Sequence, residues 1–188
     1  AYVVREANWD ENAFETEIWL ADTATGETRR LTNAKKSSDA PAFSPDGKRI
    51  AYLSERNFFF IDYYLADGET GEVITKLAKS VFDANYETFR YISSTSSWSP
   101  DSRYLTFAAR AKGGDDLVIF DPKRRKAVRR IRVNLSGLAS PVFSPDGKQL
   151  AFVSKRGDSP AQLYILPLAG GEAKRVTELP VDVDDPKW

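Results

Sequence analysis

The chain of 188 residues carries 27 Lys and Arg side chains and 27 Asp and Glu side chains, so its formal net charge at pH 7 is +0. Without a net positive field, binding to nucleic acid or to an anionic membrane surface is not expected. The chain has no histidine, cysteine or methionine, which excludes disulfides, thiolate and imidazole metal ligands, and any nucleophile that needs a histidine base. Residues 1–4 form an apolar run far too short to enter a membrane, so we expect a soluble chain, and nothing indicates its compartment.

A six-residue motif recurs along the chain and ends an aromatic strand each time. It reads Phe-Ser-Pro-Asp-Gly-Lys at residues 43–48 and 143–148, and Trp-Ser-Pro-Asp-Ser-Arg at residues 98–103. Pro fixes φ at the second position of a β-turn, Asp bonds to its own backbone and Gly accepts positive φ, so each copy predicts a tight turn. The signature residues are Phe43, Pro45, Asp46, Gly47, Trp98, Pro100, Asp101, Phe143, Pro145, Asp146, Gly147 and, at the aromatic position alone, Trp188.

The other predicted strands follow this motif in a fixed order. They are expected at residues 1–4, 18–22 and 28–32, then 50–54, 63–67 and 73–77, then 105–109, 117–121 and 127–133, and finally 150–154, 163–167 and 173–177. Each repeat thus holds four short strands joined by hairpin turns, and no stretch has a helical period. This arrangement predicts the blades of a β-propeller.

The predicted fold is therefore all-β, a single β-propeller domain over residues 1–188 with four four-stranded blades. The blades comprise residues 183–188 plus 1–32, 39–78, 93–133 and 139–177. In the first blade, the N- and C-terminal strands lie in one sheet, because residues 1–4 match 51–54 and Trp188 matches Phe43. Such sharing removes open sheet edges, and it predicts either a closed four-bladed ring or half of an eight-bladed ring completed by a homodimer.

The motif resembles the TolB-type, WD40-like propeller repeat over nearly the whole chain. Residues 1–56, with Glu17-Ile18-Trp19-Leu20, and residues 155–188, with Gln162 to Leu168, resemble the propeller of acylaminoacyl peptidases in the prolyl oligopeptidase family. Residues 57–154 resemble TolB-related propellers. This mixture suggests a recombined or designed chimera, with natural blade exchange as the alternative. The peptidase resemblance implies a propeller that gates a separate hydrolase domain, and the TolB resemblance implies protein–protein contacts.

The clearest candidate binding site is an extended loop before the third inner strand. The aromatic positions Phe43 and Trp98 are 55 residues apart, against 45 from Trp98 to Phe143 and 45 from Phe143 to Trp188. Aromatic side chains give a large contact area for a peptide or protein at low entropic cost, although they could equally cap the small core. The aromatics in this extension are Phe82, Tyr86, Phe89 and Tyr91.

Other polar groups support weaker hypotheses. Asp182, Asp184 and Asp185 could offer oxygen ligands to Ca²⁺, but the EF-hand pattern is absent and a solvated loop beside the closing strand explains them better, so no metal or cofactor is expected. The basic residues between 123 and 132 lie at a hairpin and an outermost strand, where charge blunts a sheet edge. We therefore predict a non-enzymatic propeller that is a scaffold, with or without a natural function, or that binds protein or peptide. The alternative is the gating propeller of a prolyl-oligopeptidase-family peptidase without its hydrolase domain.

Overall fold

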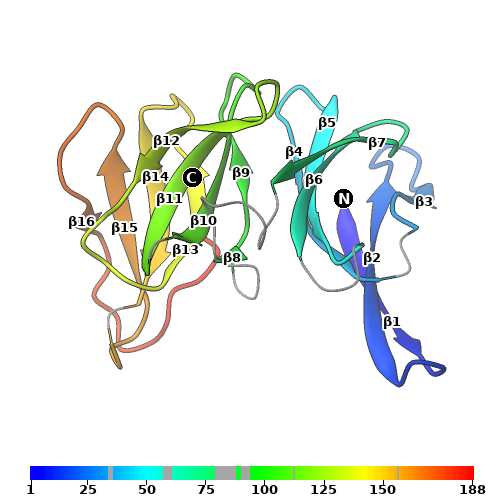
Figure 1. Cartoon of the computed structure of the whole chain (residues 1–188), viewed down its shortest axis with the longest axis horizontal. Coiled ribbons are helices and arrows are strands. Elements are labelled where there is room, and N and C mark those ends of the chain that lie inside the picture. The colour runs from blue at the N-terminus through cyan, green and yellow to red at the C-terminus, as the bar shows by residue number, and fades with distance from the viewer. Residues whose placement is uncertain (34–35, 57–60, 79–87, 90–93, 112, 156) are drawn as a thin grey trace. The chain divides into compact units, whose positions relative to one another are not determined.

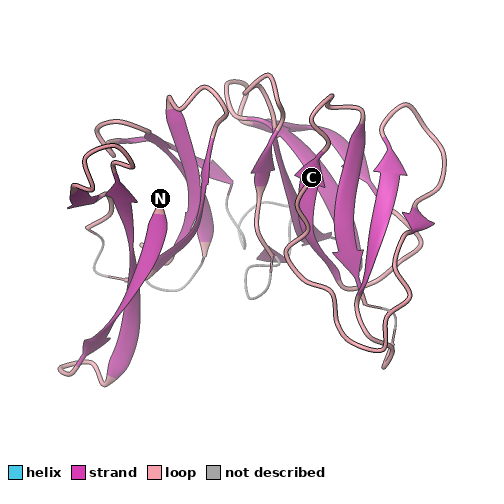
Figure 2. Ribbon diagram, turned by 180° about the vertical axis from the view of Figure 1, so that it is seen from behind, coloured by secondary structure: helices cyan, strands magenta, loops and turns pink. Residues whose placement is uncertain are grey.

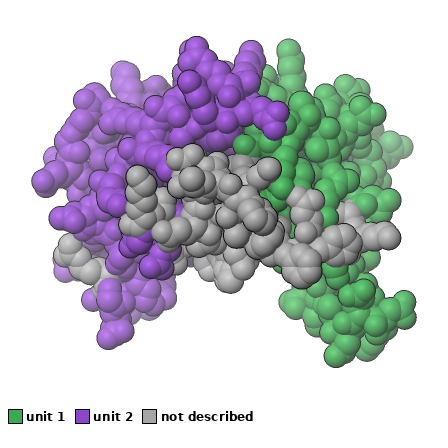
Figure 3. Space-filling view, viewed as in Figure 1, with its two compact units in different colours: residues 1–80 green, residues 81–188 purple. Residues whose placement is uncertain are grey.

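The computed structural model describes residues 1–33, 36–56, 61–78, 88–89, 94–111, 113–155 and 157–188. The chain divides into two compact units, residues 1–80 (unit 1) and residues 81–188 (unit 2), as Figure 3 shows. Every regular element in the described residues is a β-strand, joined by loops and turns (Figure 2). The described part of the chain contains no helix with the length and apolar character needed to cross a membrane.

Unit 1 contains two antiparallel sheets (Figure 1). The first has three strands in the order β1-β2-β3, and the second has four strands in the order β4-β5-β6-β7. The strands are β1 (Tyr2–Asn8), β2 (Ala13–Ala21), β3 (Thr28–Arg30), β4 (Ser38–Phe43), β5 (Arg49–Ser54), β6 (Asp62–Asp67) and β7 (Val73–Ala78).

Unit 2 also contains two antiparallel sheets. One has the order β12-β11-β10-β8, with β9 also paired to β10, and the other has the order β13-β14-β15-β16. The strands are β8 (Thr88–Phe89), β9 (Ser97–Trp98), β10 (Leu105–Ala111), β11 (Gly114–Asp121), β12 (Lys126–Ile131), β13 (Leu138–Phe143), β14 (Gln149–Ser154), β15 (Gln162–Pro167) and β16 (Lys174–Arg175).

These sheets confirm the predicted all-β propeller fold, in which each repeat forms its own antiparallel sheet. The third sheet adds a detail: β8 and β9 pair with opposite ends of the same strand, β10, so its inner edge is built from two separate pieces. The predicted sharing of the first blade is not seen among the described residues, because residues 183–188 form no strand and the first sheet has three strands. Ring closure therefore stays a prediction.

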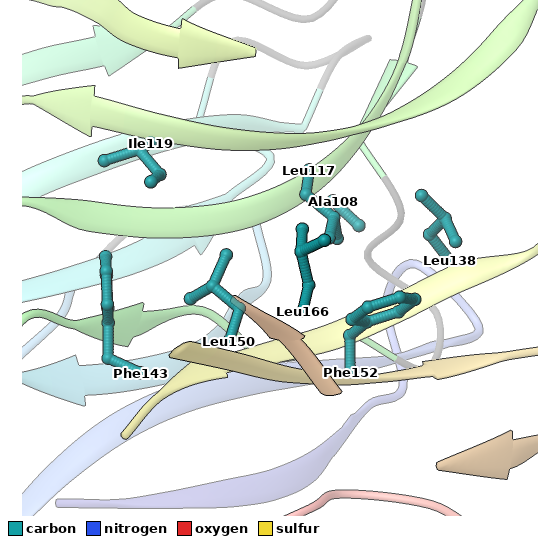
Figure 4. Close-up of a cluster of buried hydrophobic side chains, with 8 residues drawn as sticks. All are labelled: Ala108, Leu117, Ile119, Leu138, Phe143, Leu150, Phe152 and Leu166. Carbon is teal, nitrogen blue, oxygen red and sulfur yellow. The ribbon is translucent and has the colours of Figure 1, made fainter. Parts of the chain in front are cut away.

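The apolar cores lie between neighbouring sheets of the same unit. In unit 2, Leu117 and Ile119 of β11 belong to one cluster with Leu150, Phe152 and Leu166 of the fourth sheet, drawn in Figure 4. In unit 1, Ile18 of the first sheet packs with Ile50, Tyr52, Tyr64 and Ala66 of the second. Residues 150–153 are all buried, so both faces of β14 are covered, as expected for a sheet packed between layers. Burial of each large apolar side chain contributes about 1.5–3 kcal/mol.

The inner strand of the third sheet and of the fourth sheet is the strand that ends in the repeated motif, β9 in the third sheet and β13 in the fourth. Hydroxyl groups connect β13 to β9 and to the residues just before β9. The amides of Ser140 and Phe143 donate to the hydroxyl oxygens of Ser94, at 2.9 Å, and Ser97, at 3.2 Å. In return, the amide of Thr95 donates to Ser140 Oγ at 3.2 Å. In the described part of the chain, the inner strands are thus joined by side-chain acceptors and have no backbone ladder between them.

Candidate functional site

The site predicted on Phe82, Tyr86, Phe89 and Tyr91 lies outside the residues whose side chains the structure describes. Phe89 belongs to β8 through its backbone, and the other three positions are outside the described ranges. Their role in binding stays a prediction. The described residues show three other polar arrangements: the carboxylates of the repeated turns, a set of buried polar pairs, and a pocket in unit 2.

The aspartates of the repeated motif are held inside their turns. Ser44, Ser99 and Ser144 each donate a hydroxyl hydrogen bond to the aspartate two residues later, at 2.6, 2.5 and 2.7 Å. The amide two residues beyond each aspartate donates to the same carboxylate oxygen, at 3.1, 3.1 and 3.0 Å. The serine hydrogen bond is the largest cause that lowers the pKa of each carboxyl group, those of Asp46, Asp101 and Asp146. These carboxylates therefore act as acceptors that fix the turn.

A buried acid directly before the apolar run of β2, β6 and β11 was not predicted from the sequence. Glu17, Asp62 and Asp116 are each buried, and each pairs with a cation from the outermost strand of its own sheet or just beyond it. The Nη2 atom of Arg30 lies 2.6 Å from Glu17, Lys76 pairs with Asp62, and Nε of Arg132 lies 2.8 Å from Asp116. A buried carboxylate needs such a partner, because loss of solvent makes an unpaired charge costly.

The first and fourth sheets share a variant of this arrangement. Thr32 donates its hydroxyl hydrogen to Glu17 and accepts a hydrogen bond from the amide of Ile18 at 2.9 Å. In the fourth sheet, Thr177 bonds Gln162 Oε1 at 2.9 Å and accepts from the amide of Leu163 at 2.9 Å. Gln162 stands where the first sheet has Glu17, so in the fourth sheet the threonine hydroxyl donates to a neutral amide oxygen in place of a carboxylate. The signal was available in the sequence as a polar residue immediately before each third-strand apolar run.

The basic stretch between residues 123 and 132 lies in the β11–β12 turn and on β12, the outermost strand of its sheet, as predicted. Cations of this stretch have acceptors within the chain: Arg124 is 3.7 Å from Asp121, Arg129 donates to the carbonyl oxygen of Leu168, and Arg132 pairs with Asp116 as described above. This pairing favours the structural role of the stretch over a polyanion site.

One pocket of unit 2, named the unit 2 pocket below, combines buried apolar and exposed charged side chains. It has a volume of ≈ 410 Å³, within the range of small-ligand sites. Its floor is apolar, since Leu138, Val153 and Ala161 are buried, and its rim carries an ion pair in which Lys155 Nζ lies 3.8 Å from Asp182 Oδ1. The lining residues are Ser94, Gly137, Leu138, Ala139, Val153, Lys155, Ala161, Asp182, Val183 and Asp184.

The three aspartates near this pocket bond to the chain itself. Asp182 accepts from the amide of Ala161 at 2.6 Å, Asp184 from the amide of Asp185 at 2.8 Å, and Asp185 from the hydroxyl of Thr95 at 3.3 Å. Within the described ranges, no group of three or more His, Cys, Asp or Glu residues is arranged to hold a metal ion. The pocket therefore presents an apolar floor, one ammonium group and an excess of carboxylate.

Two protein families match this chain. The family model for the TolB beta propeller domain matches residues 69–188, and that for the dipeptidyl peptidase IV N-terminal region matches residues 5–110. The uncharacterized peptidase YuxL of Bacillus subtilis is 29% identical over 188 residues, which cover 100% of this chain and 26% of YuxL. Both predicted resemblances are confirmed, although the two matches overlap at residues 69–110, so the chimera stays a hypothesis.

Solved structures agree with these matches. TolB from Acinetobacter baumannii superposes with a TM-score of 0.68 at 28% identity, covering 88% of this chain and 38% of TolB. The β-propeller domain of the trilobed protease from Pyrococcus furiosus gives a TM-score of 0.61 at 21% identity, covering 94% of this chain and 53% of that domain. The chain thus spans about a quarter to a half of these proteins. It belongs to the TolB β-propeller family and, over residues 5–110, to the family of the dipeptidyl peptidase IV N-terminal region.

Proposed function

We propose that this chain is a non-catalytic propeller module that binds a short segment of protein or peptide in the unit 2 pocket. The observation that carries the proposal is the contrast between the apolar floor and the charged rim of that pocket. An apolar pocket with a few polar groups around it can anchor one side chain and fix its orientation. Membership of the TolB propeller family supports the same role.

The rim defines the chemistry of the ligand. Asp182 and Asp184 provide two negative charges and Lys155 provides one positive charge, so the pocket mouth is acidic overall. All three side chains are exposed, which leaves their charges available to an incoming group. The preferred ligand is therefore a peptide with a leucine-sized apolar anchor next to a lysine or arginine.

The chain's own residues support a role without catalysis. A histidine base is missing from the sequence, and the three motif aspartates are acceptors inside turns. The acids Glu17, Asp62 and Asp116 are paired with cations of neighbouring strands, which makes them structural groups.

Fluorescence polarisation with a labelled peptide, one leucine flanked by lysines, tests this proposal. Two exposed charges about 4 Å apart interact by about 1 kcal/mol in water, so Asp184→Lys should weaken binding about fivefold or more. Glu172→Lys is the matched control, because it makes the same charge change in the β15–β16 turn and should leave the affinity unchanged. A glutamate-flanked peptide that binds equally well, or equal effects of the two variants, would refute the assignment.

A gating propeller of a serine peptidase is the second candidate. It is favoured by the match of the dipeptidyl peptidase family model to residues 5–110 and by YuxL, which aligns with the whole chain. The full-length sequence that contains this chain distinguishes the two candidates. A downstream α/β-hydrolase domain with its own Ser-His-Asp triad would favour the gating role, and a full-length sequence without that domain would favour the binding module.

A further inference from the structure

Residues 183–188 have the backbone signature of an inner strand, although they form no strand. Asp185 has a φ of +44°, and the inner strands β4 and β13 have the same left-handed residue at Ala40 (+50°) and Ser140 (+47°). In all three segments a proline follows at once and an aromatic residue comes two positions after the proline. Positive φ is uncommon outside glycine, so its recurrence before Pro186 identifies residues 183–188 as a third copy of this signature.

This segment also occupies an inner-strand position in unit 2. The indole Nε1 of Trp188 donates to the carbonyl oxygen of Val142 in β13 at 3.3 Å, and Thr95 donates to Asp185 at 3.3 Å. Near its start, the amide of Val183 donates to the carbonyl oxygen of Ala161 at 2.9 Å. The segment thus lies beside β13, as β13 lies beside the inner strand of the third sheet. Among the described residues, it has no sheet of its own behind it.

The first sheet of unit 1 lacks the complementary strand. Among the described strands, its edge strand β1 pairs with β2 only, whereas β5, β10 and β14 each pair with an inner strand as well. One face of this sheet is also uncovered. Tyr2 and Trp19 lie opposite each other in the first sheet, and the stacked aromatics Phe152 and Tyr164 hold the same positions in the fourth sheet. Tyr2 is 39% exposed, whereas its counterpart Phe152 is 0% exposed.

The fourth sheet offers the matching face. Leu163 and Ile165 of β15 occupy the positions that Leu117 and Ile119 have in the third sheet. Leu117 and Ile119 are buried against the fourth sheet, whereas Leu163 and Ile165 are only half-buried. A sheet placed behind residues 183–188 would therefore find an apolar surface of the type that joins the third and fourth sheets.

We propose that two copies of this chain assemble head to tail, with residues 183–188 of each copy forming the inner strand of the other copy's first sheet. The registers of β4–β5 and β13–β14 transfer directly: Val183 lies opposite Val4, Asp184 opposite Val3 and Lys187 opposite Ala1. The same contact lays the face of Tyr2 and Trp19 on Leu163 and Ile165. This inference goes beyond the binding role and does not depend on it.

An assembly of two copies has a ring size that propellers adopt. The match to the propeller domain of the trilobed protease covers 94% of this chain but only 53% of that domain, so that ring needs nearly twice the residues of this chain. Two copies of four sheets would give about eight blades, within the range of about four to eight that propellers adopt. The two contacts are equivalent, so the assembly closes as a symmetric dimer.

Cysteine cross-linking tests both the register and the source of the strand, because the chain has no cysteine of its own. Ala1→Cys and Lys187→Cys are made as separate variants at exposed positions, purified, mixed and oxidised. The expected product is a disulfide-linked species of twice 21.0 kDa that contains both variants, with light scattering of the unsubstituted chain giving the same doubled mass. The matched control is Glu6→Cys mixed with Lys187→Cys. Glu6 lies five residues along β1 from Ala1, about 17 Å away, beyond the reach of a disulfide.

Three results would overturn the proposal. A monomeric mass, with no mixed disulfide, would show that residues 183–188 do not pair with β1 of a second copy. A disulfide within one chain in the double variant Ala1→Cys/Lys187→Cys, at 21.0 kDa, would show that the chain closes on itself. Equal cross-linking of Ala1→Cys and Glu6→Cys would exclude the stated register.

Discussion

Replacing Lys76 by methionine removes the cation that pairs with Asp62 while keeping most of the aliphatic stem. The Asp62 side chain is 3% exposed and the Lys76 side chain 24% exposed, so the carboxylate would be left buried and some water would still reach it. Breaking a fully buried pair costs about 3–5 kcal/mol, and the partial access of water lowers our expectation to about 2–3 kcal/mol. With a urea m-value of about 2 kcal/mol/M, the unfolding midpoint should fall by about 1 M.

Urea titration followed by tryptophan fluorescence measures this change, with Lys36→Met as the matched control in the same unit. Lys36 pairs with Glu11 at 3.0 Å, but the Glu11 side chain is 57% exposed, so this variant should leave the midpoint unchanged. The double variant Asp62→Leu/Lys76→Met should recover most of the loss, because it removes the buried charge together with its cation. Equal midpoints for Lys76→Met and Lys36→Met would refute the reasoning that burial of the acid makes this pair important.

Further predictions concern the turns. Gly47→Ala should destabilise unit 1 by about 1–2 kcal/mol in thermal unfolding, because Gly47 has a φ of +70° that a side chain disfavours. Arg125→Gly should raise the melting temperature or leave it unchanged, because Arg125 has a φ of +54° at the turn position that glycine occupies in the first two sheets. Lowered pKa values of Asp46 and Asp146 mean that their stabilising effect is complete above the unfolded pKa of about 3.9 and is lost as the pH falls through the lower folded values. The urea midpoint should therefore fall on acidification from about pH 5 to about pH 2, and Asp146→Asn should make that fall shallower.

The sequence was sufficient to predict the sheets because the strand-ending motif repeats almost unchanged. The proline, aspartate and glycine of residues 45–47 each act through local backbone geometry, so their effect can be read without knowledge of distant contacts. Pairing within each repeat joins strands that are close in sequence, which is why the third and fourth strands were found together with the motif. The interruption between β8 and β9 was missed because Thr88 and Phe89 lie in an extension that has no counterpart in the other repeats.

The buried pairs were missed for a different reason. Their acids are Glu17, Asp62 and Asp116, and the fourth sheet has Gln162, so the repeats share a position but not a residue type. Their partners come from the next strand at sequence separations that differ between sheets, because the cation stands at a different distance beyond the turn in each sheet and the strand pairs contain register shifts. Burial, which requires the neighbouring sheet, turns these residues into a pair, and burial is a property of the folded chain.

The hydroxyl contacts between inner strands bear on how propellers of this family change in length. Ser94 and Ser97 satisfy the amides of Ser140 and Phe143 without a backbone ladder, so the third and fourth sheets each complete their ladders internally. Insertion or deletion of a whole repeat therefore breaks no backbone pairing, provided that the new neighbour presents serine or threonine at the same level. A few hydroxyl groups make these repeats interchangeable units, on which duplication and recombination of genes can act without loss of the fold.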